Sequence, residues 1–174
     1  MIISKPKEGE YPEFATPYFN SLPNDLNLID LLIKNLKSII ELYVSIPNDK
    51  YMYRYAEDKW TTKEVLLHII DTERVFAYRA LAYARGEKVE LPSYHESVYA
   101  KNSNANSRTA TDLLDELKTV RLSTISLYKS FSHEQFAIVG KTTQSNLSVV
   151  ATAFFILGHS IHHIQIIREK YLTK

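Results

Sequence analysis

The sequence predicts an all-α protein, an antiparallel up-down-up-down four-helix bundle that forms a single domain over residues 1–174. A long loop is expected between the second and third helices. Three observations carry this prediction. Four segments of about twenty to twenty-five residues place apolar residues at spacings of three and four, which is the period of an α-helix. Helix start and stop signals bound these segments. No segment shows the strict alternation of apolar and polar residues that is typical of a β-strand.

The first two helices have clear boundaries in the sequence. The first covers residues 25–45, with a proline just before it and another just after it. The second covers residues 61–85. At its start, Thr61 and Glu64 fit a capping box, in which each side chain accepts a hydrogen bond from the other residue's backbone N–H. Gly86 suits the left-handed conformation that ends many helices.

The third and fourth helices follow the long loop. The third covers residues 109–131, with Thr109 as its N-terminal cap, and the fourth covers residues 146–172. A short extra helical turn is expected near residues 132–135. The loop at residues 87–108 is long for a helical bundle, and it is either a plain crossover connection or a lid over a functional site.

The fourth helix contains a stretch long enough to cross a bilayer. Residues 147–167 hold no Asp, Glu, Lys or Arg. They do hold three histidines, a glutamine and several hydroxyls, which are costly in lipid. No second segment of this kind exists to pack against it there. A helix that is apolar on all sides also suits the centre of a soluble bundle, and we favour that interpretation.

Composition excludes several classes of function. The net charge is +1, from 21 basic and 20 acidic residues, and the basic residues are scattered. This pattern predicts neither a nucleic-acid-binding protein nor one bound to an anionic membrane. The chain has no cysteine, which excludes disulfides, thiolate zinc sites and cysteine nucleophiles. The N-terminus lacks the apolar core of a signal peptide, so a cytoplasmic location is expected.

Half of the six histidines lie in the short sequence GHSIHHI, residues 158–164. His159 and His163 are four residues apart and therefore share one face of the fourth helix. Paired metal ligands often take this spacing. His162 lies on the flank of the same face. Two histidines alone do not make a tight site, so a third ligand is needed from another element.

His68 is the candidate for that third ligand. It lies among apolar residues of the second helix, which indicates that it is buried. In the predicted topology the second and fourth helices run parallel. His68 then lies at the same height in the bundle as His159 and His163 if the fourth helix begins lower in the bundle than the second. Alternatively, each histidine is a core residue with its own hydrogen-bond partner. Three buried imidazoles would then need three separate hydrogen-bonding arrangements, whereas one metal would use all three.

The face of the second helix that carries His68 is polar. At helical spacing it holds Glu64, Asp71, Thr72, Val75 and Arg79. Glu64 or Asp71 would either accept a hydrogen bond from a ligand imidazole or serve as an ordinary charge near the helix N-terminus.

The general base is not identifiable from the residues. Four side chains are candidates for the pocket around the metal: Asp71, Thr72, Tyr99 and His162.

Two motifs resemble those of a known family. WTTKEVLLHIIDTER, residues 60–74, looks like the second-helix pattern of the DinB/YfiT-like superfamily of metal-dependent enzymes. GHSIHHIQIIREKY is similar to the family's fourth-helix pattern, Gly-His-x-x-His-His followed by a basic-acidic-Lys-Tyr ending. The resemblance implies a four-helix bundle with one divalent metal held by three histidines. Matched position by position, the ligands are His68, His159 and His163, and His162 is not a ligand.

The resemblance also bears on activity. Relatives include S-transferases that use bacillithiol or mycothiol, a thiol-dependent maleylpyruvate isomerase and proposed hydrolases, and many form homodimers, which is the oligomeric state it suggests here. In the loop after the second helix, relatives often show an aromatic residue followed by an acidic one. Here Tyr94 is followed by His95 and then Glu96. The resemblance therefore does not identify the substrate of this protein.

The resulting hypothesis is a metal-dependent enzyme that acts on a small-molecule substrate. Three imidazoles suit zinc, nickel or iron and leave coordination positions open. Such a metal activates water or a thiol near neutral pH. A low-molecular-weight thiol S-transferase of the bacillithiol type and a hydrolase are both compatible with this site. The alternative is a non-catalytic bundle that binds a metal or a small ligand. A structural zinc usually has four protein ligands, and only three are visible here, which favours catalysis.

Overall fold

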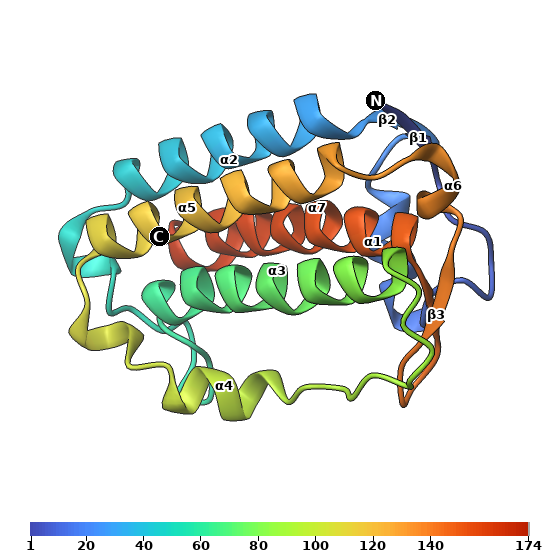
Figure 1. The fold of residues 1–174 in the computed structure, drawn as a ribbon. Coiled ribbons are helices and arrows are strands. Elements are labelled where there is room, and N and C mark those ends of the chain that lie inside the picture. Colours follow the sequence, from blue (N-terminus) through green and yellow to red (C-terminus); the bar gives the residue numbers. More distant parts are fainter. Residues whose placement is uncertain (174) are drawn as a thin grey trace.

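The computed structural model describes residues 1–173 as a bundle of long helices with short elements at its ends (Figure 1). The long helices are α2 (Leu28–Ser45), α3 (Thr62–Ala84), α5 (Ala110–Lys129) and α7 (Val149–Ile166), which continues as the π-helical turn η4 (Ile167–Tyr171). The short helical segments are η1 (Glu13–Ala15), α1 (Thr16–Asn20), η2 (Asn48–Lys50), α4 (Glu96–Asn102), η3 (Ala105–Ser107) and α6 (His133–Phe136). The predicted all-α four-helix bundle is confirmed.

Four short strands form two antiparallel pairs that the sequence did not predict. One pair joins β1 (Ile2–Ser4) to β2 (Asp25–Asn27), and the other joins β3 (Val139–Lys141) to β4 (Asn146–Ser148). Each strand has three residues, which is too short to show a two-residue period. The first pair holds the N-terminal segment against the start of α2.

The predicted helix ends are largely confirmed. The N–H of Glu64 donates to Thr61 Oγ1 over 3.1 Å, and the N–H of Thr61 donates to Glu64 Oε2 over 2.7 Å, which completes the capping box of α3. Gly86 follows the helix with φ of 88°, in the left-handed region. Thr109 caps α5 by accepting a hydrogen bond from the N–H of Asp112 over 3.1 Å.

The order of helix directions differs from the predicted up-down-up-down order. Lys63 Nζ donates to the backbone oxygen of Arg108 near the starts of α3 and α5, and Arg121 pairs with Glu73 further along both helices. The helices α3 and α5 therefore run parallel, whereas α7 runs antiparallel to α3 (Figure 1). The order is up-down-down-up.

The long loop makes this order possible. The helix α3 has 23 residues and is roughly 34 Å long at 1.5 Å per residue. Residues 85–109, which include α4 and η3, run back along its length before α5 begins (Figure 1). Helical periodicity shows which face of a helix is buried but not which end of the bundle the helix starts from, so the sequence pattern did not reveal the direction.

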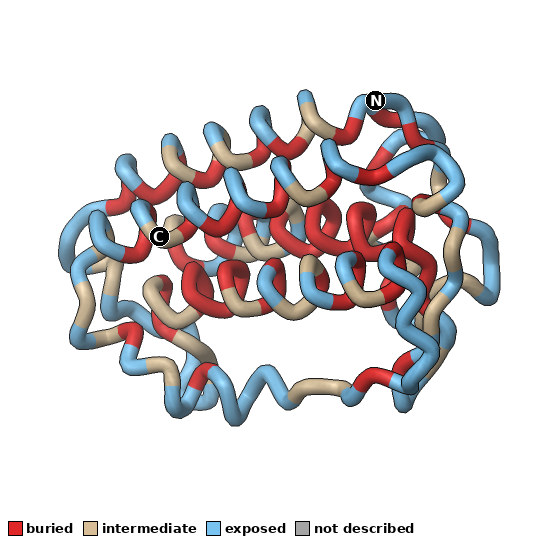
Figure 2. Tube along the Cα trace, in the orientation of Figure 1, coloured by how far each residue is buried: buried red, intermediate tan, exposed pale blue. Residues whose placement is uncertain are grey.

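The helix α7 lies at the centre of the bundle. All residues from Leu147 to Ser160 are buried, and this is the longest uninterrupted buried stretch within residues 1–173 (Figure 2). The apolar segment over Val149–Tyr171 is long enough to cross a membrane, but 72% of its most apolar window is buried against the other helices. This is the arrangement expected for the core helix of a bundle.

Candidate metal centre

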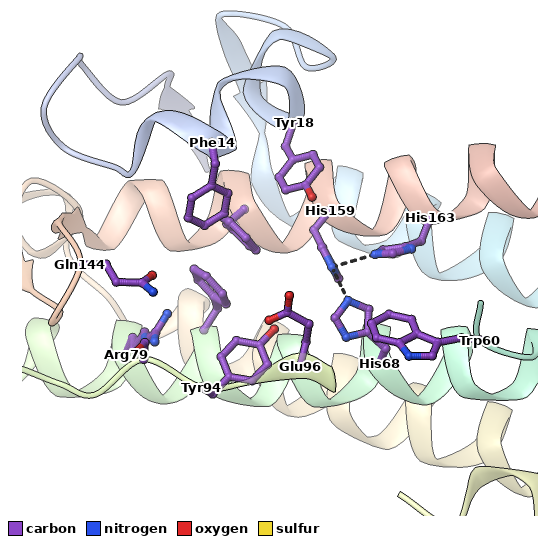
Figure 3. A pocket seen from close by; sticks show the side chains of 13 residues that line it. Phe14, Tyr18, Trp60, His68, Arg79, Tyr94, Glu96, Gln144, His159 and His163 are labelled. Atoms are coloured by element: carbon purple, nitrogen blue, oxygen red, sulfur yellow. Dashed lines mark hydrogen bonds between the residues drawn. The ribbon is translucent and has the colours of Figure 1, made fainter. Parts of the chain in front are cut away.

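The structure brings His68, His159 and His163 together. His68 Nε2 lies 2.9 Å from His159 Nε2, and His163 Nε2 lies 3.0 Å from the same atom (Figure 3). One ring nitrogen from each residue lies within 4.8 Å of the others. The antiparallel packing of α3 on α7 explains the match, because His68 lies near the start of α3 and the other two lie in the second half of α7. The three residues predicted as ligands therefore share one site, which we call the histidine trio.

Burial keeps the histidine trio neutral. Desolvation lowers the pKa of His68 to about 4, although the carboxylate of Glu96 acts in the opposite direction. Burial lowers the pKa of His163 to about 3, and the neighbouring imidazoles add to the effect. The same causes hold the pKa of His159 well below its ordinary value. At neutral pH all three rings are therefore neutral, which is the form that ligates metals.

The donor set fits a divalent metal better than a set of core histidines. A neutral imidazole has one N–H donor and one lone pair, and a core histidine usually satisfies both. His163 Nδ1 is buried and has no hydrogen-bond partner within residues 1–173. The Nε2 atoms of the histidine trio face one another instead of separate protein partners (Figure 3). Three neutral nitrogen donors around one point suit zinc, nickel or iron.

A cavity of about 410 Å³ extends from the histidine trio (Figure 3). Its volume lies in the range of small-molecule sites. Apart from the trio, its lining consists of six aromatic and four polar residues: Phe14, Tyr18, Trp60, Phe76, Tyr94, Phe155, Arg79, Ser93, Glu96 and Gln144. Phe76 from α3 and Phe155 from α7 stack with centroids 3.8 Å apart and form an apolar part of the wall.

The four side chains that the sequence suggested for this pocket do not line the cavity. Asp71 and Tyr99 line a different surface depression, where Asp71 lies 3.6 Å from the guanidinium of Arg74. Thr72 is buried behind the cavity wall and shares a hydrogen bond of 2.7 Å with the hydroxyl of Tyr94. His162 is exposed on α7.

Several cavity residues were missed by the sequence reasoning. Glu96 begins α4 and brings a carboxylate to the cavity, close enough to influence the pKa of His68. In the sequence, Glu96 lies two residues after Tyr94 in the long loop and differs there from the family pattern, but this position did not indicate that its side chain reaches the cavity. Arg79 belongs to the polar stripe of α3, which already indicated a polar surface beneath His68. Phe14 and Tyr18 come from the N-terminal segment, which carried no helix prediction.

These features define a class of protein: a helical bundle whose second and fourth long helices place three neutral histidines on an aromatic cavity. Residues 32–167 match the model of the DinB superfamily, and the chain belongs to this superfamily. The resemblance that the two motifs suggested is therefore confirmed. No curated protein sequence matches the chain.

Solved structures share the fold. YfiT from Bacillus subtilis, described as a probable metal-dependent hydrolase with an unusual four-helix bundle topology, has a TM-score of 0.72 and 18% identity over 95% of this chain and 90% of its own. YjoA, a DinB-like protein from Bacillus subtilis, has a TM-score of 0.58 and 20% identity over 86% of this chain and 94% of its own. A mycothiol-dependent maleylpyruvate isomerase has a TM-score of 0.64 and 12% identity over 89% of this chain and 63% of its own. At these identities the likeness establishes the fold alone.

Proposed function

We propose that this protein is an enzyme that acts on a small molecule with the help of one divalent metal held by His68, His159 and His163. The observation that carries the proposal is the convergence of three neutral imidazoles on one wall of an aromatic cavity. Within residues 1–173 the group of clustered metal-binding side chains contains no carboxylate and no fourth histidine. Three protein ligands with open positions are typical of catalytic rather than structural sites.

When bound, a metal on three neutral imidazoles supplies Lewis acidity and favours the deprotonated form of a water or thiol near neutral pH. The protein residues around it then position the reactants. Trp60 packs on His68 with ring centroids 4.7 Å apart, and Tyr18 packs on His159 with centroids 5.8 Å apart. These aromatic contacts fix the orientation of the imidazoles and exclude water from one side of the site.

Glu96 is the proton acceptor in this proposal. Its carboxylate points into the cavity on the side of the histidine trio (Figure 3). Because it lies on α4, outside the trio, it is free to take a proton from the nucleophile as that group attacks. Asp71, which the sequence suggested only as a candidate for the pocket, faces Arg74 instead.

Transfer of a low-molecular-weight thiol, of the bacillithiol type, is the first candidate reaction. The chain has no cysteine, so the thiol nucleophile would be a co-substrate bound in the cavity. The mycothiol-dependent isomerase with the same fold supports this choice. Hydrolysis by activated water is the second candidate, supported by the description of YfiT.

An activity screen tests the proposal. Protein reconstituted separately with zinc, nickel or iron would be assayed for conjugation of low-molecular-weight thiols to chlorodinitrobenzene and for hydrolysis of nitrophenyl esters. We expect one metal form to be active, and the metal-free protein and His68→Ala to be inactive. If no loaded form exceeded these controls in either assay, the non-catalytic alternative, a bundle that binds metal or a small ligand, would replace the enzyme.

A homodimer and a cytoplasmic location stay predictions.

A further inference from the structure

Arg79 is a buried cation without an acidic partner among residues 1–173. Its side chain is only 7% exposed, and its hydrogen bond in the described chain runs from Nη2 to the backbone oxygen of Pro92 over 2.9 Å. No ion pair joins it to a carboxylate within residues 1–173. The guanidinium lies 4.9 Å from the centroid of the Phe76 ring. Burial also lowers the pKa of Arg79 from its ordinary value, although the group stays charged.

Another buried arginine shows how the same chain satisfies such a group. Arg121 is fully buried and donates to both carboxylate oxygens of Glu73, to the backbone oxygen of Leu32 and to Asn35 Oδ1. Arg121 thus has both an acidic partner and a full set of acceptors, as a structural buried arginine requires. In the described part of the chain Arg79 has neither, and its remaining N–H donors are available to a ligand.

Arg79 lines the same cavity as the histidine trio, at the other end (Figure 3). It follows His68 by three helical turns on α3, which is roughly 16 Å along the helix axis. Ser93 and Gln144 lie at the same end, where the loop after α3 meets the β3–β4 hairpin through the bridge between Leu91 and Thr142. The apolar stack of Phe76 and Phe155 lines the cavity as well.

We propose that Arg79 binds the carboxylate of an elongated ligand whose apolar middle packs on Phe76 and Phe155 and whose other end reaches the histidine trio. A single guanidinium balances one negative charge, and Glu96 places a like charge in the same cavity, so a carboxylate monoanion fits better than a phosphate dianion. The proposal rests on the proposed function only for the chemistry at the histidine end. The anion site at Arg79 stands independently of a metal.

Binding to metal-free protein tests the anion site without testing the metal. Isothermal titration calorimetry would compare phenylbutyrate with phenylbutanol, which has the same carbon skeleton and no charge. We expect phenylbutyrate to bind roughly ten- to a hundredfold more tightly, because it makes charge-assisted hydrogen bonds to Arg79. Arg79→Gln should remove this preference, and Arg79→Lys should keep part of it. The matched control is Arg85→Gln, which removes an exposed arginine from the end of the same helix and should keep the preference.

The comparison of the two ligands on the wild-type protein needs no variant, so it is decisive even if Arg79→Gln does not fold. Equal affinities, or no binding of phenylbutyrate at millimolar concentration, would overturn the proposal. A preference that persists in folded Arg79→Gln would overturn it too. If the protein prefers phenylbutyrate over phenylbutanol but cannot be loaded with metal, the anion site at Arg79 is supported and the proposed metal-dependent function is contradicted.

Two reactants share this ligand chemistry, and a second titration on metal-loaded protein distinguishes them. If mercaptohexanoate binds more tightly than mercaptohexanol and displaces phenylbutyrate, Arg79 holds the carboxylate of the thiol. If the two thiols bind equally while phenylbutyrate keeps its preference over phenylbutanol, Arg79 holds the carboxylate of the other substrate. Either result supports an anion site at Arg79.

Discussion

His68, His159 and His163 lose their charge because the surrounding helices remove them from water. The folded protein holds the pKa of His68 at about 4 and that of His163 at about 3, against an ordinary value of 6.5. The unfolded chain therefore binds protons between about pH 4 and pH 6.5 that the folded chain does not bind. The contribution of these groups to stability is fully present above pH 6.5 and is lost as the pH falls through this window.

This difference predicts an acid-sensitive fold. For metal-free protein, the free energy of unfolding should fall between pH 7 and pH 5 by about 1–2 kcal/mol for each buried histidine. Urea denaturation at the two pH values measures this fall. His68→Gln should reduce it, whereas His133→Gln, which removes an exposed histidine, should not. An equal fall in His68→Gln and wild type would show that His68 is not held neutral by burial.

Glu96 provides a second prediction at the residue scale. Glu96→Gln keeps the shape of the side chain and removes its ability to accept a proton. If the carboxylate is the base, kcat should fall by about 10²-fold or more with the substrate found by screening. Metal content should not change, because Glu96 is not a member of the histidine trio. The matched control is Glu90→Gln on the exposed part of the same loop. Unchanged kcat in Glu96→Gln would remove this residue from the mechanism.

At the scale of elements, the contact between α1 and α7 depends on Gly158. A Cβ added to Gly158 would lie 2.5 Å from the backbone oxygen of Tyr18, which is too close for real atoms. Glycine here lets α1 approach α7 closely and places Tyr18 at the cavity. This is the role of the first residue of GHSIHHI, and the sequence pattern alone did not show it.

Gly158→Ala should therefore destabilise the protein. On a free helix surface the same change would be favourable by about 1 kcal/mol, because alanine has the higher helix propensity. Here the clash with Tyr18 should dominate and cost about 1–3 kcal/mol. Thermal unfolding measures the sign. An increase in Tm would mean that α1 does not pack on α7 as closely as the structure shows.

The elements that the sequence predicted are those with strong local signals. The capping box at Thr61, the cap at Thr109 and the left-handed Gly86 all act through neighbours within a few residues. The elements that it missed, among them α1, α4 and the four strands, have three to seven residues each and pack against distant parts of the chain. Such short segments have no period of their own to detect.

At the scale of the whole molecule, the buried pair of Arg121 and Glu73 belongs to a hydrogen-bond network that joins all four long helices. Arg121 on α5 donates to Glu73 on α3 and to the backbone oxygen of Leu32 on α2, while Asn35 on α2 accepts from both Arg121 and Ser160 on α7. This network ties together helices whose directions the sequence did not predict. It satisfies polar groups in the middle of the bundle that would otherwise be buried without partners.

Breaking the pair should destabilise the whole bundle. Arg121→Met leaves the carboxylate of Glu73 buried without a counter-charge, which should cost about 3–5 kcal/mol. Lys118→Met on the same helix removes an exposed ion pair with Asp115 and should cost at most about 1 kcal/mol. Urea denaturation compares the two variants. Equal effects would contradict the structural role of the buried pair.

The proposed metal ligands and the rest of the candidate site differ in how far they could be predicted. Two of the proposed ligands are four residues apart on one helix, and the third, His68, lies in an apolar segment, so spacing and resemblance were sufficient to select these three candidates. The cavity depends on which chain segments meet there, and residues such as Glu96 and Gln144 arrive through the long loop and a hairpin. Their positions follow from the up-down-down-up order, which local patterns do not encode.

Metal content tests the central claim most directly. Untagged protein would be incubated with zinc, nickel or iron, freed of excess metal and measured by inductively coupled plasma mass spectrometry. We expect about one divalent metal per chain in wild type, and its loss in His68→Ala and His159→Ala, because two imidazoles do not make a tight site. His162→Ala is the matched control, since His162 is adjacent to His163 but exposed, and it should keep the metal. Folded wild-type protein without bound metal, or variants that bind as much metal as wild type, would contradict the account.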